Sequence, residues 1–221
     1  MLNVPLVDLA IGRVAPVVGP GSIAVNVHAG RRQLEAHLQG SVHLSVEEPL
    51  ALGTAGAVAH VRTWLDGRPV LVVNVDAWHA AALAPLVERW DGKRVCVLVA
   101  GPSGVAFGPR SPVVGSILPW SEVASLPCEP SGLWEVSWRA HAAGGRLQVI
   151  DVATEVIDCG TPRRYLAANL AASGGDSVVG PGAVVEGRLV RSVVWPGGVV
   201  RGDEVLVDCI RVGDTVTVDA R

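Results

Sequence analysis

One short stretch of the chain, residues 70–76, limits the fold more than any other. It reads Val-Leu-Val-Val-Asn-Val-Asp, four apolar residues followed by a segment with two short polar side chains. Such an unbroken apolar run is typical of a strand buried on both faces of a parallel sheet that helices cover. Ligands of these sheets bind beyond the carboxyl ends of the strands. A carboxylate there suits a divalent cation, although Asp76 could instead cap a helix beginning near Trp78.

Apolar runs alternate with segments of helical spacing through most of the chain. This alternation indicates βαβ units. Strands are predicted at residues 23–27, 42–46, 70–73, 95–99, 113–118 and 147–152, and helices at residues 2–18, 31–38, 55–65, 79–90, 132–143 and 163–172. We therefore expect an α/β domain over residues 1–173, with a Rossmann-like, mostly parallel sheet and helices on both of its faces.

The carboxyl-terminal segment, residues 174–221, has a different character. Residues 179–184, 194–199 and 212–216 resemble one another, and their glycines at 182, 197 and 213 are separated by 15 and 16 positions. Apolar residues on both sides of a repeated glycine turn fit short strands stacked in a β-solenoid of about three coils. A pair of ordinary hairpins is the alternative.

Composition excludes several classes of function. The formal net charge of −3 gives no electrostatic reason to expect nucleic acid or an anionic membrane as a partner. No apolar run approaches the length of a membrane span. The four cysteines are widely spaced, which favours reduced thiols in a cytoplasmic protein over a zinc site or redox motif. The six histidines show no metal-binding spacing.

Residues 47–56 form a second segment of interest, because they follow one predicted strand and precede a predicted helix. The segment reads Glu-Glu-Pro-Leu-Ala-Leu-Gly-Thr-Ala-Gly. Small residues at a helix start let backbone N–H groups approach a ligand. Glu47 or Glu48 could accept hydrogen bonds from the edge of a nucleobase.

Three motifs occur together and in a characteristic order. They are Leu-Gly-Thr-Ala-Gly at 52–56, Asn-Val-Asp at 74–76 and Asp-Cys-Gly-Thr-Pro-Arg-Arg-Tyr-Leu-Ala-Ala-Asn at 158–169. The chain resembles the sugar-1-phosphate nucleotidyltransferase family, and within it the mannose-1-phosphate guanylyltransferase and glucose-1-phosphate thymidylyltransferase group. Members of that family tend to carry a left-handed β-helix of hexapeptide repeats after the α/β domain, which the tail resembles.

The resemblance implies a reaction and a set of site residues. The substrates would be a nucleoside triphosphate and a sugar 1-phosphate, and the products an NDP-sugar and pyrophosphate. Asp76 and Asp158 would be the catalytic carboxylates that hold Mg²⁺. The residues implied in nucleotide and sugar binding are Glu47, Gly53, Thr54, Gly56, Asn74 and Gly115. Neither the base nor the sugar can be read from the sequence, and assembly into a homo-oligomer is left open.

The sequence departs from the family pattern at its start. The family's glycine-rich loop with an Arg and a Pro-Lys pair is absent, and residues 1–6 resemble the segment that follows it. The lysine expected near the sugar phosphate is also missing, and Arg110 is its candidate replacement. Either the recorded chain begins at an internal Met, or it is a homologue that has lost the loop, together with the first strand of the sheet. In both cases we expect little transferase activity.

Two other functions compete with catalysis. One is a non-catalytic nucleotide-sugar sensor or regulatory subunit, which the absent loop favours and the two retained aspartates do not. The other is an acyltransferase, suggested by the tail. Acyltransferases of that type use a general base, usually His, and no histidine follows His141. We therefore place the acyltransferase last.

Overall fold

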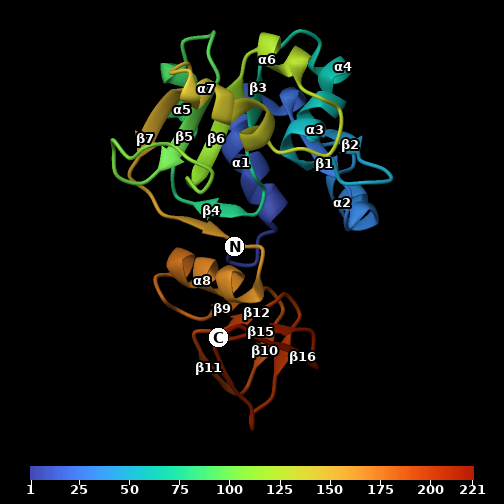
Figure 1. Ribbon diagram of the computed structural model, residues 1–221. Helices are drawn as coiled ribbons and strands as arrows, with labels where there is room; N and C mark the ends of the chain where they lie inside the picture. Colours follow the sequence, from blue (N-terminus) through green and yellow to red (C-terminus); the bar gives the residue numbers. More distant parts are fainter. The chain divides into compact units, whose positions relative to one another are not determined.

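The computed structural model describes residues 1–221, and the chain divides into two compact units (Figure 1). The sheet unit consists of residues 11–74 and 81–155, and the solenoid unit of residues 1–10, 75–80 and 156–221. These bounds differ from the predicted division at residue 173, because residues 156–173 and two short earlier segments belong with the tail. No helix is long and apolar enough to span a membrane.

The sheet unit contains a four-stranded sheet and a separate pair of strands. The strands are β1 (Ala24–Val27), β2 (His43–Val46), β3 (Val70–Val72), β5 (Cys96–Ala100), β6 (Val113–Leu118) and β7 (Gln148–Val152). The larger sheet has the order β3-β6-β5-β7, and only its β5–β7 pair is parallel. β1 and β2 pair in parallel. The fold is α/β as predicted, but its main sheet is mixed and the expectation of a mostly parallel sheet is wrong.

The strand β3 shows why the apolar run misled the prediction. It lies at an edge of the sheet, antiparallel to β6, and all three of its residues are only half-buried. Val70 and Val72 pack against the core on one side. β5 and β6 instead hold the residues that are buried on both faces, among them Leu98 and Leu118. An apolar run fits an edge strand with one covered face as well as a central strand.

Helices surround these strands in the sheet unit. Their bounds are η1 (Pro20–Ser22), α2 (Arg31–Leu38), α3 (Gly53–His60), α4 (Arg62–Leu65), α5 (Ala84–Arg89), α6 (Trp120–Ser125), η2 (Trp134–Trp138) and α7 (Arg139–Ala143), while α1 (Leu6–Val18) has residues in both units. The main core of the sheet unit includes Ala55 of α3, Leu118 of β6 and Val123 of α6. The predicted helix at 132–143 begins as a π-helix, η2.

The solenoid unit is built mostly of very short strands. They are β4 (Ala77–His79), β8 (Val156–Asp158), β9 (Val178–Val179), β10 (Val184–Val185), β11 (Arg188–Val190), β12 (Val193–Val194), β13 (Val199–Val200), β14 (Val205–Val207), β15 (Cys209–Val212) and β16 (Val216–Asp219). Its one long helix, α8 (Pro162–Ser173), starts as predicted: Thr161 is the N-cap, and its hydroxyl accepts from the N–H of Arg164 at 3.3 Å.

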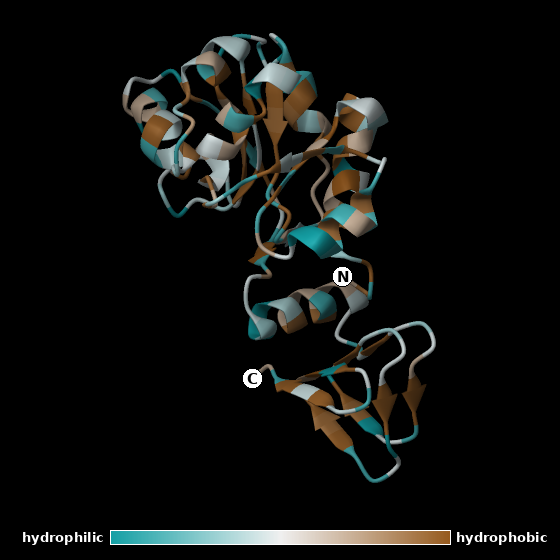
Figure 2. Cartoon of the chain, turned by 90° about the vertical axis from the view of Figure 1, so that its right-hand side faces the viewer, coloured by the Kyte–Doolittle hydropathy of each residue, from teal (hydrophilic) through white to brown (hydrophobic).

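Successive coils of the tail stack in parallel. β9, β12 and β15 form one set of parallel neighbours, β10 and β13 a second, and β11 and β14 a third. Gly182, Gly197 and Gly213 all have positive φ angles, as the repeated turn requires. Figure 2 shows the hydrophobic strands separated by more polar turns. Parallel pairing excludes ordinary hairpins for these strands, except that β16 returns antiparallel to β15. The left-handed sense of the coil stays a prediction.

Residues 77–79 form a strand, not the start of a helix. The helix predicted at 79–90 is reduced to α5, and β4 pairs antiparallel with β8, which the sequence pattern did not reveal. The interpretation of Asp76 as the cap of a helix near Trp78 is therefore wrong, because an extended segment follows it.

Candidate functional site

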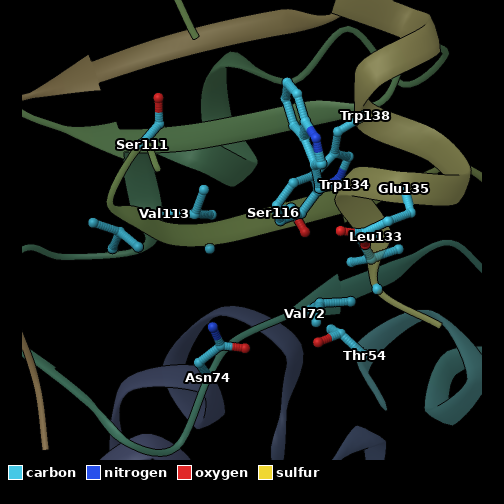
Figure 3. Close-up of a pocket in the computed structure, with 13 residues that line it drawn as sticks. Thr54, Val72, Asn74, Ser111, Val113, Ser116, Leu133, Trp134, Glu135 and Trp138 are labelled. Carbon is cyan, nitrogen blue, oxygen red and sulfur yellow. The ribbon is translucent and has the colours of Figure 1, made fainter. Parts of the chain in front are cut away.

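A pocket of about 260 Å³ lies in the sheet unit (Figure 3). Its walls come from α3, the end of β3, the segment before β6, β6 itself and η2. The lining residues are Thr54, Val72, Asn74, Ser111, Val113, Val114, Gly115, Ser116, Gly132, Leu133, Trp134, Glu135 and Trp138. A concave site with apolar walls and a few polar groups is the usual form of a small-molecule site.

The π-helix η2 supplies the aromatic wall. Trp134, Glu135 and Trp138 all line the pocket from this single wide turn, and π-helical turns occur frequently at functional sites. The ring of Phe107 packs edge-on against both indoles, with centroid distances of 5.7 Å to Trp134 and 5.9 Å to Trp138. This packing holds the two indoles in place around the pocket.

Several polar groups of the pocket have no partner within the protein. The side chains of Thr54, Asn74 and Glu135 make no intramolecular hydrogen bond. The indole N–H of Trp138 is buried and also unpaired. Asn74 and Glu135 are exposed and Thr54 is half-buried, so water can satisfy them. Buried polar groups are nearly always hydrogen-bonded, so the Trp138 N–H is the group whose missing partner is unusual.

The pocket has no positive charge among its lining residues, because none of them is Lys, Arg or His. Its only ionisable side chain is Glu135. A phosphate group bound here would meet no counter-charge. The pocket therefore suits an uncharged part of a ligand, with hydrogen-bonding groups and apolar faces.

The structure brings three of the predicted binding residues together and gives the others different roles. Thr54, Asn74 and Gly115 all line the pocket. Glu47 is buried, with an exposed fraction of 2%. Its two carboxylate oxygens accept from the Asn26 side-chain amide at 3.0 Å and from the Leu52 N–H at 2.8 Å. Each oxygen thus already accepts a hydrogen bond within the protein, which gives Glu47 a structural role, and its predicted contact with a base edge stays a prediction.

At Gly53 and Gly56 a larger residue would clash with backbone atoms of the protein itself. A Cβ atom at Gly53 would lie 2.6 Å from the carbonyl oxygen of Ser131, and one at Gly56 would lie 2.4 Å from that of Glu129. Gly53 also has a positive φ of 65°. Neither residue lines the pocket. The two glycines therefore allow residues 129–131 to approach α3 closely. The prediction had instead expected them to allow a ligand to approach.

Asp76 and Asp158 lie next to each other in the solenoid unit. The N–H of Cys159 donates to the carbonyl oxygen of Asp76 at 2.7 Å, and Asp158 pairs with Ala77 in the β4–β8 ladder. Burial raises the pKa of the Cys159 thiol, and the negative charges of Asp76 and Asp158 add to this effect.

The carboxylate of Asp158 already has two partners. The N–H of Gly160 donates to its Oδ1 at 2.8 Å, and Arg164 donates to its Oδ2 at 2.9 Å. No group of three His, Cys, Asp or Glu side chains that could hold a metal ion occurs in the molecule. Mg²⁺ commonly uses one or two carboxylates and takes its other ligands from water and substrate phosphates. In the ladder Asp158 lies opposite Ala77, so the side chains of Asp158 and of Asp76, the residue before Ala77, leave the backbone on alternate faces, and their joint role in holding a cation stays a prediction.

The other residues that the sequence singled out lie apart from the pocket lining. Arg110 is exposed in the loop before β6. Trp195 packs edge-on against Tyr165 of α8, with ring centroids 6.4 Å apart, within the solenoid unit. Sequence reasoning missed Ser116, Trp134, Glu135 and Trp138. Two tryptophans four positions apart, with a carboxylate between them, were the available signal.

Comparison with solved structures shows the fold. The chain is similar to a protein from Thermus thermophilus described as a mannose-1-phosphate geranyltransferase, with a TM-score of 0.68 and 17% identity over 97% of this chain and 85% of that one. It is also similar to a putative glucose-1-phosphate thymidylyltransferase from Bacillus anthracis, solved with sucrose, with a TM-score of 0.63 and 14% identity over 78% and 83% of the two chains.

A third similar structure is that of HddC from Yersinia pseudotuberculosis complexed with GMP-PN. Its TM-score is 0.52, at 14% identity over 76% of this chain and 83% of that one. No protein-family model and no curated protein matched the sequence. Fold similarity without closer sequence similarity does not fix activity. The chain therefore shares its fold with these solved structures.

Proposed function

We propose that this chain binds a nucleoside triphosphate and a sugar 1-phosphate and transfers the nucleotidyl group, giving an NDP-sugar and pyrophosphate, with the low activity that we expect of a sequence without the family's glycine-rich loop. One observation carries the proposal: Thr54, Asn74 and Gly115, three residues from separate segments that the family resemblance implies in binding, line a single pocket. The shared fold supports the same general function. The pocket would hold the uncharged part of the substrate, where Thr54 and Asn74 donate and accept hydrogen bonds.

Asp76 and Asp158 are the residues that would hold Mg²⁺ in this proposal. When bound, the cation would neutralise negative charge on phosphate oxygens during the displacement. The chain itself would contribute positioning, which is the main requirement of phosphoryl-type transfer. No nucleophilic side chain is required, because an oxygen of the sugar phosphate is the attacking atom.

A second candidate is a non-catalytic protein that binds nucleotide sugars. The observation in its favour is the state of Asp158, whose two oxygens are engaged by Gly160 and Arg164. A carboxylate neutralised in this way does not need a cation. Ligand binding without turnover would then be the function, with the same pocket holding the sugar or the nucleoside.

Calorimetry and pyrophosphate release test the proposal and separate the two candidates. Purified chain would be titrated with NDP-sugars and sugar 1-phosphates, and pyrophosphate measured with matched pairs of NTP and sugar phosphate in MgCl₂. Thr54→Val should weaken binding about fivefold or more, because it removes a hydrogen-bonding hydroxyl. Thr63→Val, at an exposed position of α4, is the matched control and should bind like wild type.

The possible results of these two measurements distinguish the two candidate functions. Binding together with pyrophosphate release supports the transferase. Binding without release supports the non-catalytic candidate. If folded protein binds no member of the panel, both candidates are wrong.

A further inference from the structure

We propose that two copies of this chain associate through one end of the solenoid, with the first coil of one copy against the first coil of the other. The first coil consists of β9, β10 and β11, and its edge facing away from the second coil is the open end. This inference concerns an interaction surface and does not depend on the proposed transfer reaction. Because the opposite end of the solenoid is closed, the association stops at two copies.

The first observation is a difference in burial between equivalent interior positions of the first two coils. Val179 pairs with Val194 in the β9–β12 ladder, and Val185 with Val200 in the β10–β13 ladder. Val194 and Val200 belong to the core of the solenoid and are both 0% exposed. Val179 and Val185 are 48% and 36% exposed. Neighbours in a parallel ladder point to the same face of the sheet, so the core is uncovered at the first coil.

The second observation is that every strand of the first coil has an edge without a partner strand. β9 is the last strand of the sheet β16-β15-β12-β9, while β10 and β11 pair only with β13 and β14. The N–H groups of Val184 and Glu186 donate to the second coil. The N–H of Val185 between them points away from that coil, because successive groups alternate along a strand. Such edges are templates for pairing with another chain.

The third observation is that the opposite end is closed. β16 returns antiparallel to β15 and ends the sheet there. Arg211, which stands next to Val194 on this side, is buried and forms an ion pair with Glu204. Its guanidinium also donates to the hydroxyl of Thr217 at 2.9 Å and to the carbonyl oxygen of Val199 at 2.7 Å. Solenoids need polar caps at their ends for solubility, and the third coil supplies one.

A second copy is the partner that matches the open end. A single extended peptide can pair with one strand edge, whereas this surface has three edges around an uncovered core. Another first coil, turned about a two-fold axis, presents the same three edges and the same exposed valines. Two open ends would permit a filament, but one open end gives a closed pair.

The charges of the first coil fit this symmetry. Glu186 and Arg188 are both exposed and lie on either side of Gly187, at the corner between β10 and β11. A two-fold axis through this corner pairs β9 with β9 of the other copy, and β10 with β11, in antiparallel directions. The same axis brings Glu186 of each copy next to Arg188 of the other. Complementary charges of this kind fix the register of an interface.

Sedimentation velocity of the full chain, from about 2 to about 200 μM, tests the inference. Wild type should shift from monomer to dimer as its concentration rises and should form nothing larger. Val185→Asp should raise the dissociation constant of the dimer about tenfold or more, because association would bury carboxylates without partners. Val216→Asp is the matched control, since Val216 is an exposed valine of β16 at the closed end. It should leave the dissociation constant unchanged.

Charge variants test the two-fold axis without placing a charge at an interior position. Glu186→Arg and Arg188→Glu should each weaken the dimer about threefold or more, because like charges then meet across the axis. The double variant should restore the dimer. Amide hydrogen exchange at Val185 should also slow at high protein concentration, because its N–H becomes paired in the dimer.

Wild type that stays monomeric up to about 200 μM overturns the inference. So does a dimer that Val185→Asp and both single charge variants leave unchanged, or one that folded Val216→Asp weakens as much as Val185→Asp. Species larger than a dimer contradict the closed pair. If circular dichroism shows that Val185→Asp does not fold, the charge variants decide. The proposed function is tested separately, because neither ligand binding nor pyrophosphate release enters these measurements.

Discussion

The main-chain N–H of Cys159 donates a 2.7 Å hydrogen bond to the carbonyl oxygen of Asp76. This bond extends the β4–β8 ladder beyond the pair of Ala77 and Asp158. Two acidic residues that are far apart in the sequence thereby become neighbours at the end of a two-stranded ribbon. Their proximity is a property of the backbone pairing, and the proposed cation site depends on it.

Removal of the guanidinium from Asp158 should strengthen cation binding. Arg164 forms a 2.9 Å ion pair with Asp158, and both side chains are more than half exposed. Exposed pairs contribute up to about 1 kcal/mol, so Arg164→Gln should raise the affinity for Mn²⁺ about two- to fivefold, as measured by electron paramagnetic resonance. Arg163→Gln, at the exposed neighbouring position, is the control. Equal Mn²⁺ affinity in wild type and Arg164→Gln would contradict the proposed site, as would full retention of binding in Asp158→Asn.

Two glycine substitutions should change stability in opposite directions. A Cβ at Gly56 would meet the backbone oxygen of Glu129 at 2.4 Å, whereas one at Gly12 in α1 has open space around it. Gly56→Ala should lower the free energy of unfolding by about 1–3 kcal/mol, because the backbone must shift. Gly12→Ala should raise it by about 0.5–1 kcal/mol through helix propensity. Urea denaturation measures both, and a neutral Gly56→Ala would show that the 129–131 segment does not pack as described.

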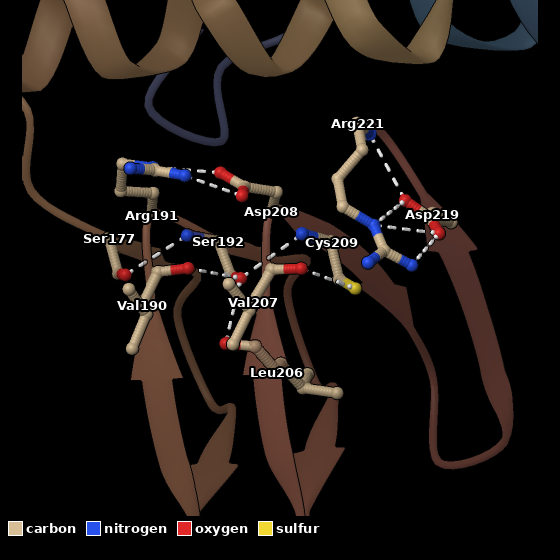
Figure 4. Close-up of polar contacts among 10 residues, drawn as sticks. All are labelled: Ser177, Val190, Arg191, Ser192, Leu206, Val207, Asp208, Cys209, Asp219 and Arg221. Atoms are coloured by element: carbon tan, nitrogen blue, oxygen red, sulfur yellow. Dashed lines mark hydrogen bonds and ion pairs between the residues drawn. The ribbon is translucent and has the colours of Figure 1, made fainter.

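Ser192 connects successive coils of the solenoid (Figure 4). Ser192 is fully buried. Its hydroxyl accepts a hydrogen bond from the N–H of Cys209 at 3.1 Å, and the same hydroxyl is within donating distance, 3.1 Å, of the carbonyl oxygen of Leu206. Ser192→Ala leaves the half-buried N–H of Cys209 and the buried carbonyl of Leu206 without the hydroxyl, which should cost about 1–3 kcal/mol of stability. Ser121→Ala, at an exposed position, should be neutral. If Ser192→Ala unfolds at the same temperature as wild type, the contact of Ser192 with the next coil does not stabilise the protein, which would contradict this prediction.

Asp91 should make stability depend on acid pH. Hydrogen bonds from the Arg94 N–H, the Arg94 side chain and the Lys93 N–H lower the pKa of this carboxyl from 3.8 to about 2. Because the folded-state pKa is the lower one, the stabilisation is present above about pH 4 and is lost as the pH falls towards about 2. The stability difference between wild type and Asp91→Asn should therefore be constant from about pH 5 to 7 and should shrink below about pH 4. A difference that stays constant down to about pH 3 would disprove the assignment.

Local signals in the sequence predicted local structure well. Thr161 followed by Pro162 predicted the start of α8, and the structure confirms the cap. The repeated glycine turns of the tail predicted stacked strands, which the structure also shows. In each case the decisive interaction lies within a few residues, or repeats at a fixed spacing, so that the sequence contains it directly.

Features that depend on distant partners could not be predicted. The edge position of β3 is set by its antiparallel pairing with β6, and nothing in the apolar run at 70–73 specifies that partner. Glu47 was expected to face a ligand, but its carboxylate accepts hydrogen bonds from Asn26 and Leu52. The contact with Asn26 depends on the pairing of β1 with β2, which the sequence does not reveal. The pocket itself depends on η2, because a helical periodicity does not distinguish a π-turn from an α-turn.

A crystal structure of the chain soaked with the NDP-sugar that it binds most tightly tests the central claim most directly. The account predicts that the uncharged part of the ligand lies in the pocket, in contact with Thr54 and the indoles of Trp134 and Trp138. A ligand that is well ordered elsewhere, with this pocket empty, would contradict it.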